Sequence, residues 1–126
     1  WMGASVSRRI DLAVEIARSK LPERARLQEI YDVIGCTLAI SESVPAAFGV
    51  LVMADGSPQR TAMYAAGLSG DADTVAAMAC AIAGAWKGVA AFDRDVLAKL
   101  REANPEYDFE ATAKGLLALA EKNLAR

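Results

Sequence analysis

Two carboxylates and a hydroxyl stand together near the middle of the chain. Asp71 and Asp73 are two residues apart, Thr74 follows directly, and a long uncharged run of small residues begins after them. Carboxylates at this spacing can present several hard oxygens on one side of a tight turn, as Mg²⁺ or Mn²⁺ prefers. Asp is also a common helix N-cap, because it accepts hydrogen bonds from the free N–H groups of a first turn. The spacing therefore leaves a metal site and a simple helix start as alternatives.

Composition excludes several other chemistries. The sequence contains no histidine, which excludes imidazole bases, Ser-His and Cys-His nucleophile pairs and His-ligated zinc in these residues. A calcium-binding helix-loop-helix that began at Asp71 would need a glutamate at its twelfth position, where the chain has Ile82. Any reaction on these residues would therefore use oxygen groups.

Charge and hydropathy narrow the range of partners. The 126 residues carry a net charge of −2 with acidic and basic side chains interleaved, so no nucleic-acid partner is expected. Cys36 and Cys80 lack a C-x-x-C spacing, and we expect buried free thiols in a reducing, cytoplasmic setting. The uncharged run from Thr74 to Trp86 is shorter than the ~20 residues that span a bilayer, so no membrane partner is expected either.

Helical periodicity runs through the chain and predicts an all-α fold, a compact orthogonal multi-helix bundle. Gly35 is predicted to end the second helix in a left-handed conformation. Ser43 is predicted to cap the third helix, with Pro45 in its first turn and the last turn near Ala54; a short strand at 50–53 is the alternative. The apolar stripes are Ile10, Val14, Ala17 and Leu21 in the first helix and Leu27, Ile30, Tyr31 and Ile34 in the second.

Four more helices are predicted in the second half. The fifth, at 74–89, is apolar nearly all round and is expected at the centre of the bundle, with closely packed neighbours. The boundary residues are Asp55-Gly56 as a turn, Ser57-Pro58, Asp93 and Asp108 as helix starts, and Asn104-Pro105 as a stop. The buried stripe expected in the seventh helix is Phe109, Ala113, Leu116, Leu117, Ala120 and Leu124. Residues 1–126 are expected to form a single all-helical domain or fragment.

The sequence resembles the C-terminal half of the ADP-ribosylglycohydrolase family in the stretches GDADTVAAMACAIAGAWKG and ISESVPAAFGVL. Members of that family carry a G-[GN]-D-[TA]-D-T-[IV] motif, followed by a small-residue helix that ends in G-A-x-x-G. The resemblance covers most of the chain, and the aspartate motif and SVPAA are its distinctive parts. Ser69 stands where the family usually has Gly or Asn, and Cys80 stands where it usually has Gly.

This resemblance implies an all-α hydrolase that cleaves the bond at the anomeric carbon of ADP-ribose with two Mg²⁺ or Mn²⁺ ions. Asp71 and Asp73 would be catalytic, and together with Thr74 they would be the metal ligands that the C-terminal half supplies. The family's N-terminal acidic metal motif is absent from these residues. The chain alone is therefore expected to be inactive and to need the N-terminal half of the same fold as a partner.

The resemblance also places Gly35, Glu42 and Ser43 near the nucleotide pocket, as candidate cofactor-binding residues. As a helix cap alone, Ser43 would need no such role. Tyr64 and Trp86 could stack on a base, but an aromatic at helical spacing in an apolar run is more often part of the core. Arg8 and Arg9 could contact a diphosphate, but a solvated helix face is the expected place for both.

Three functions follow from these alternatives. The favoured one is the C-terminal piece of a metal-dependent glycohydrolase, which acts on an ADP-ribosylated protein or a small molecule that contains ADP-ribose. The second is a catalytically silent relative that serves as a binding or structural module. The third is a helical interaction domain in which Asp71 and Asp73 are only helix caps.

The first residue, Trp1, is not a methionine, and we expect a fragment whose central apolar helix lacks part of its cover. Exposed apolar surface of that kind favours self-association, so a homo-oligomer is expected. Gel filtration of the chain alone should give a dimer or a larger species. Elution as a well-behaved monomer would contradict this expectation.

Overall fold

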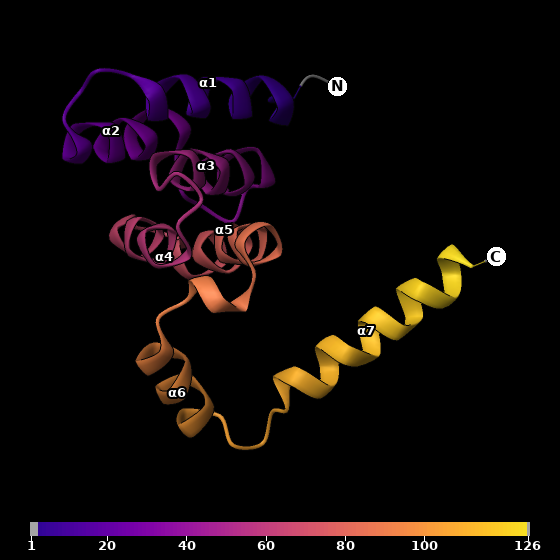
Figure 1. The fold of residues 1–126 in the computed structure, drawn as a ribbon. Helices are drawn as coiled ribbons and strands as arrows, with labels where there is room; N and C mark the ends of the chain where they lie inside the picture. Colours follow the sequence, from indigo (N-terminus) through magenta and orange to yellow (C-terminus); the bar gives the residue numbers. More distant parts are fainter. Residues whose placement is uncertain (1–2, 126) are drawn as a thin grey trace. The chain divides into compact units, whose positions relative to one another are not determined.

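The computed structural model describes residues 3–125; Trp1, Met2 and Arg126 of the predicted domain lie outside the described residues. Contacts divide the chain into two units, one that extends to Phe92 and one that begins at Asp93. The first unit contains α1 (Val6–Arg18), α2 (Glu23–Glu29), the π-helix η1 (Ile30–Ile34), α3 (Ile40–Met53), α4 (Pro58–Gly67), α5 (Ala72–Lys87) and the 3₁₀ turn η2 (Val89–Ala91). The second contains α6 (Arg94–Ala103) and α7 (Phe109–Leu124) (Figure 1).

The all-α prediction is confirmed, because residues 3–125 contain helices and no strand. The alternative of a strand at 50–53 is wrong, since these residues lie in the last turn of α3. None of the helices within 3–125 combines the length and the apolar character needed to cross a membrane.

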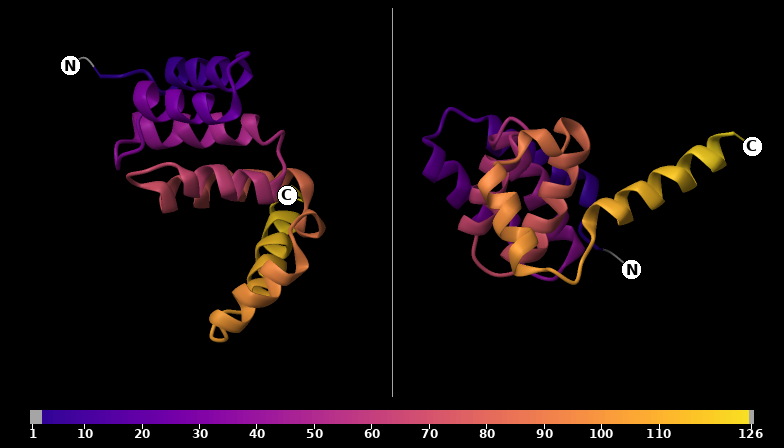
Figure 2. Two further views of the ribbon diagram at one scale, coloured as in Figure 1. Left: turned by 90° about the vertical axis from the view of Figure 1, so that its left-hand side faces the viewer. Right: turned by 60° about the horizontal axis from the view of Figure 1, so that its bottom comes forward.

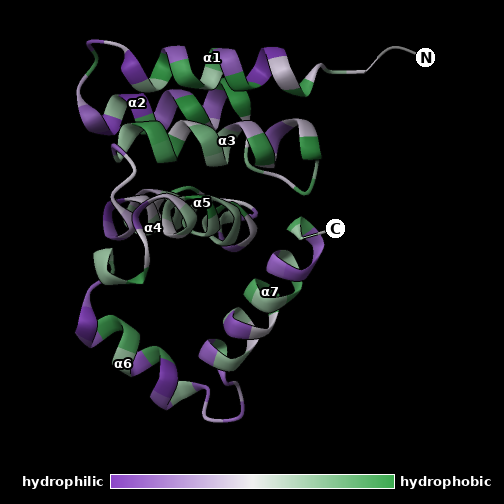
Figure 3. Cartoon of the chain, turned by 45° about the vertical axis from the view of Figure 1, so that its right-hand side comes forward, coloured by the Kyte–Doolittle hydropathy of each residue, from purple (hydrophilic) through white to green (hydrophobic). Residues whose placement is uncertain are grey.

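The central helix of the first unit is α3. It packs on α1 and η1 on one side and on α4 and α5 on the other (Figures 1 and 2). Apolar residues predominate along α3 (Figure 3), and Val50, Leu51 and Met53 are among its buried side chains. Burial of such side chains stabilises the fold by about 1.5–3 kcal/mol each, which favours α3 as the helix that is covered on several sides.

The prediction that 74–89 occupies the centre of the bundle is wrong. Within the first unit, α5 buries one stripe, which consists of Val75, Ala79 and Ala83. Most uncharged side chains of α5 are alanines, each of which has little apolar area. Covering α5 on every side would therefore stabilise the fold only a little.

The caps and turn residues predicted from the sequence lie at helix boundaries with one exception. Asp93 and Asp108 accept hydrogen bonds from backbone N–H groups of α6 and α7, and Gly35 ends η1 with φ +88°, as predicted. The exception is Ser43, which was expected as an N-cap. It lies inside α3, which begins at Ile40, and its hydroxyl donates to the carbonyl of Ala39 at 3.2 Å. The first helix is also shorter than its predicted apolar stripe, because α1 ends at Arg18 and Leu21 lies outside it, 45% exposed.

Two expectations about single side chains fail. Trp86 is 61% exposed, with its ring beside Gly56 and the Lys87 Nζ 4.1 Å from the ring centroid. Arg9 does not lie on a solvated face, because its guanidinium donates to backbone carbonyls of Ile34 and Ser41. Tyr64 is buried as expected.

The second unit is polar on one side of each helix and apolar on the other (Figure 3). The Arg101–Glu110 salt bridge, 2.8 Å long, joins the end of α6 to the start of α7. The predicted burial of the α7 stripe is wrong in this structure: Leu116 is 64% and Leu124 88% exposed. The periodicity marks an apolar face correctly, but α6 and α7 pack little against each other within this unit, so the face stays uncovered.

Burial at Ile30 gives a direct test of the core. Ile30 is fully buried, whereas Ile40 is 68% exposed. Replacing each by alanine removes the same atoms from a buried and from an exposed position. Ile30→Ala is expected to lower the free energy of unfolding by roughly 2–5 kcal/mol, and Ile40→Ala by less than about 0.5 kcal/mol. Urea denaturation followed by circular dichroism measures both. Equal losses would contradict the packing described for η1 and α3.

Candidate functional site

The candidate site consists of the end of the loop between α4 and α5 and the first turn of α5, residues 69–74, which are called the acidic turn below. Asp71 stands at the N-cap position of α5, but its carboxylate makes no capping hydrogen bond to the helix backbone. Its Oδ1 instead accepts a hydrogen bond from the Thr74 hydroxyl at 2.9 Å. The helix therefore begins here without using the Asp71 side chain as its cap.

The negative charges of the acidic turn are not neutralised by basic side chains. Within 3–125 the salt bridges join Arg60 to Glu23 and Arg101 to Glu110, and neither includes Asp71 or Asp73. Asp73 and Thr74 are exposed and Asp71 is half-buried. Hard oxygens with free charge are the donor type that suits a small divalent cation.

A second segment, the loop 35–39, packs directly on the acidic turn. The Asp71 N–H donates to the Cys36 carbonyl at 2.8 Å. Gly70 has φ +76°, and a Cβ at this position would lie closer than 3.0 Å to the same carbonyl oxygen. Only glycine combines this backbone conformation with so close an approach. The glycine before the first aspartate is thus required by the contact between the two segments.

The Cys36 thiol is within electrostatic reach of three carboxylates. The side chain is buried, and burial raises the pKa of the thiol. The negative charge of Asp71 raises this pKa further, the hydrogen bond from the Asp71 backbone lowers it, and the charges of Glu42 and Asp73 raise it with smaller effects. The two carboxylates of the acidic turn and that of Glu42 in α3 therefore act electrostatically on one sulfur.

Glu42 reaches the loop from the first turn of α3. Its Oε2 accepts a hydrogen bond from the Thr37 hydroxyl at 2.8 Å, and a Cβ on Gly35 would lie 2.5 Å from the same oxygen. The structure thus brings Gly35 and Glu42 to the segment on which the acidic turn packs. Ser43 is different, because it is buried and its hydroxyl is engaged with the α3 backbone.

The acidic side chains do not by themselves form a metal cage. Among residues 3–125, no group of three or more His, Cys, Asp or Glu side chains is gathered closely enough to hold a metal ion. Mg²⁺ takes six ligands in near-octahedral geometry. The acidic turn can therefore provide part of a coordination shell.

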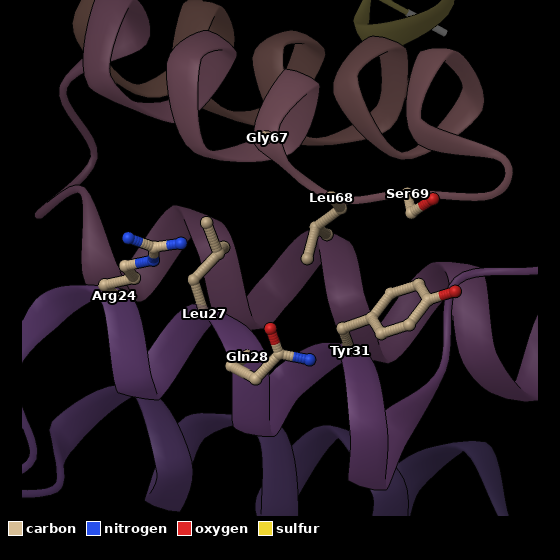
Figure 4. A pocket seen from close by; sticks show the side chains of 7 residues that line it. All are labelled: Arg24, Leu27, Gln28, Tyr31, Gly67, Leu68 and Ser69. Carbon is tan, nitrogen blue, oxygen red and sulfur yellow. The ribbon is translucent and has the colours of Figure 1, made fainter.

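A groove borders the acidic turn on the side of α2 and η1 (Figure 4). It has a volume of about 340 Å³ and reaches Ser69, two residues before Asp71 in the sequence. The side chains that line it are those of Arg24, Leu27, Gln28, Tyr31, Leu68 and Ser69, together with Gly67. It combines an apolar floor with a guanidinium, an amide, a phenol and a hydroxyl.

Tyr31 lines this groove, whereas the sequence predicted it in the buried stripe of the second helix, and that prediction is wrong. It is 39% exposed and belongs to the π-helical turn, which the Gly35 N–H closes by donating to the carbonyls of Ile30 and Tyr31. A π turn has more residues per turn than an α-helix, so the 3.6-residue periodicity does not hold through it. No pattern in the sequence indicated this change of helix type.

Cys36, Thr37 and Gly70 are the site residues that the sequence did not single out. Gly70 directly precedes the aspartates, and a glycine at that point could have been interpreted as a close-approach position. Cys36 acts through its backbone carbonyl, so the type of its side chain gives no indication of this contact.

The sequence of this chain matches a known protein family. The model of the ADP-ribosylglycohydrolase family matches residues 1–126. The uncharacterized protein YegU of Escherichia coli is 37% identical over 113 residues, which are 90% of this chain and 34% of that protein. The chain thus spans about a third of the length of this relative. No solved structure matches the chain significantly.

Gly70→Ala tests the contact between the two segments, with Gly88→Ala as its matched control. Both glycines have φ +76°, but a Cβ at Gly88 meets open space whereas one at Gly70 meets the Cys36 backbone. Backbone strain should lower the free energy of unfolding by about 1–3 kcal/mol in both variants, and steric overlap should add to this loss only in Gly70→Ala.

Urea denaturation measures these losses. Native-state alkylation followed by mass spectrometry then shows whether Cys36 becomes accessible. We expect faster alkylation of Cys36 in Gly70→Ala alone. Equal stability losses with unchanged alkylation would show that the close approach at Gly70 is unimportant.

Proposed function

Because the chain belongs to the ADP-ribosylglycohydrolase family, we propose that it forms the C-terminal part of a metal-dependent hydrolase. The proposed reaction is cleavage of the glycosidic bond at the anomeric carbon of ADP-ribose. The observation that carries this proposal is the state of Asp71: it occupies a helix N-cap position, yet its carboxylate is left free of the helix backbone. A carboxylate that only started a helix would be expected to accept from the N–H groups of the first turn.

The donor set of the acidic turn supports the metal part of the proposal. Asp71, Asp73 and Thr74 offer hard oxygens with two negative charges, in a turn that no arginine or lysine within 3–125 neutralises. We propose these three as ligands for two Mg²⁺ or Mn²⁺ ions in the complete site. Divalent cations in such sites supply Lewis-acid assistance and lower the pKa of a nucleophilic water.

The protein groups have roles of their own in this proposal. The Thr74 hydroxyl donates to Asp71 and so fixes the orientation of that carboxylate. The first-turn N–H groups of α5 provide donors and a positive dipole end for anionic oxygens of a ligand. The loop 35–39 fixes the turn through the hydrogen bond between Cys36 and Asp71.

Gly35 and Glu42 are proposed to border the nucleotide part of the substrate. Both lie at the loop that carries Cys36, and Glu42 is oriented by the Thr37 hydroxyl. Ser43 would act through the backbone of α3, because its hydroxyl is buried against the Ala39 carbonyl.

The remaining ligands are proposed to come from the N-terminal half of the same fold. The acidic turn supplies too few oxygens for two cations, and three or more potential ligands do not gather anywhere in 3–125. The substrate would be an ADP-ribosylated protein or a small molecule that contains ADP-ribose. The same shortage of ligands favours the second candidate, a catalytically silent binding or structural module of this family.

Asp71→Asn and Asp73→Asn distinguish these functions in the gene product that contains these residues. Each change removes a negative charge with little change in shape, whereas Asp11→Asn on α1 removes a charge away from the acidic turn. Mn²⁺ with ADP-ribose should raise the melting temperature of the parent and of Asp11→Asn, because ligand at about 100 times its Kd stabilises by about 2.7 kcal/mol. Both site variants should lose most of this shift.

Release of ADP-ribose from an ADP-ribosylated peptide, measured by mass spectrometry, is the second readout. Hydrolysis should depend on Mn²⁺ or Mg²⁺ and fall at least about tenfold in both site variants, as expected for loss of a charged ligand. A thermal shift without hydrolysis would favour the silent binding module. If neither signal appears in the parent, the metal-dependent function is wrong.

A further inference from the structure

The guanidinium of Arg9 holds both ends of the loop that packs on the acidic turn. Arg9 lies on α1, and its Nε donates to the Ser41 carbonyl at 2.5 Å. Its Nη2 donates to the Ile34 carbonyl. Ile34 is the last residue of η1 and Ser41 lies in the first turn of α3, so one side chain fixes the segment at the point where it leaves one helix and where it enters the next.

The two carbonyls that Arg9 contacts are those that the helices leave free. Ser41 would normally accept from the N–H of residue 45, but this residue is Pro45, which has no N–H. Ile34 ends its helix, where carbonyls lack partners within the helix. Backbone carbonyls of this kind need another donor when they are removed from water. The guanidinium provides both donors from one planar group.

The segment between these two carbonyls carries the groups that contact the acidic turn. Its Cys36 carbonyl accepts the hydrogen bond from the Asp71 N–H at 2.8 Å, and its Thr37 hydroxyl donates to Glu42. A displacement at either end of the segment would move the Cys36 carbonyl relative to α5. The position of the Asp71 backbone therefore depends on a side chain that touches none of the candidate ligands.

We propose that Arg9 is a positioning residue for the acidic turn, which it holds in place through the loop 35–39. The consequence for cation binding rests on the proposed function, whereas the structural link between Arg9 and Asp71 does not. Arginine suits this position because its fork presents several donors in fixed directions, while lysine carries its donors on a single nitrogen. The neighbouring Arg8 is exposed; its backbone N–H donates to the Ser5 hydroxyl, and among residues 3–125 its guanidinium makes no hydrogen bond or salt bridge.

Hydrogen exchange at the Asp71 amide gives the direct test in the full chain. Arg9→Ala should speed exchange of this amide by about tenfold, the effect of losing a hydrogen bond to a charged group. Arg8→Ala is the matched control and should leave the amide unchanged. Arg9→Lys keeps the charge but not the fork, and should give an effect close to that of Arg9→Ala. The Ala79 amide in the buried stripe of α5 reports on general opening of the first unit.

The outcomes separate positioning from general stability. Faster exchange at Asp71 with an unchanged Ala79 supports the proposal. An unchanged Asp71 amide in a folded Arg9→Ala protein overturns it. Equal acceleration at Asp71 and Ala79 in both Arg9→Ala and Arg9→Lys also overturns it, since Arg9 would then only stabilise the fold.

Mn²⁺ titration of the gene product that contains these residues, followed by electron paramagnetic resonance of free Mn²⁺, tests the consequence for the site. The Mn²⁺ concentration at half-saturation should rise about tenfold in Arg9→Ala, in proportion to the loss of the ordered turn, and stay unchanged in Arg8→Ala. If the parent binds no Mn²⁺ while exchange at Asp71 still responds to Arg9, the positioning role is supported and the proposed metal-dependent function fails. If Mn²⁺ binds equally well to the parent and to Arg9→Ala, positioning for the cation is overturned and the proposed function stands.

Discussion

The hydrogen bond from the Asp71 N–H to the Cys36 carbonyl is the contact on which the candidate site depends. It joins two segments that are far apart in the sequence, and it forms only because Gly70 allows the backbones to approach closely. A buried carbonyl without a partner would cost about 1–3 kcal/mol, so the contact is favourable for both segments. Through it the orientation of the first turn of α5 is set by the loop 35–39. The acidic side chains are thus held by backbone geometry and by the Thr74 hydroxyl, and no salt bridge within 3–125 includes them.

The same loop is linked to a proline inside α3 through the side chain of Arg9. Pro45 lies inside α3, where a proline costs about 3 kcal/mol or more when the freed carbonyl has no other donor. Arg9 contributes that donor to Ser41 and a second one to Ile34. The long side chain of Arg9 therefore connects α1, η1 and α3 at one point. The same side chain therefore pairs the Ser41 carbonyl that Pro45 leaves free and holds the two ends of the loop that contacts the acidic turn.

Sequence reasoning succeeded where the determinants are local. The caps at Asp93 and Asp108 and the positive φ of Gly35 depend on single residues and their nearest neighbours, and each was predicted correctly. It failed where tertiary contacts decide. Ser43 has the chemistry of a cap, but α3 begins three residues before it, at Ile40, and the Ser41 carbonyl that Pro45 cannot pair accepts from Arg9 instead. Likewise, the apolar face of α7 was identified correctly, but its burial depends on contacts that periodicity does not encode.

For the candidate site, the residue types were predictable and their assembly was not. Carboxylate oxygens at 71 and 73 are compatible with a cation site or with a simple helix start, and one turn provides too few ligands for a tightly bound ion. Ligands contributed by another part of a fold must then meet this turn at distances fixed to a few tenths of an ångström. A mobile turn would lose affinity through the entropy of ordering it at each binding event. If the proposed metal site exists, the contacts of Gly70, Cys36 and Arg9 would reduce this loss in advance, and a partial set of ligands would then gain from fixed backbone support.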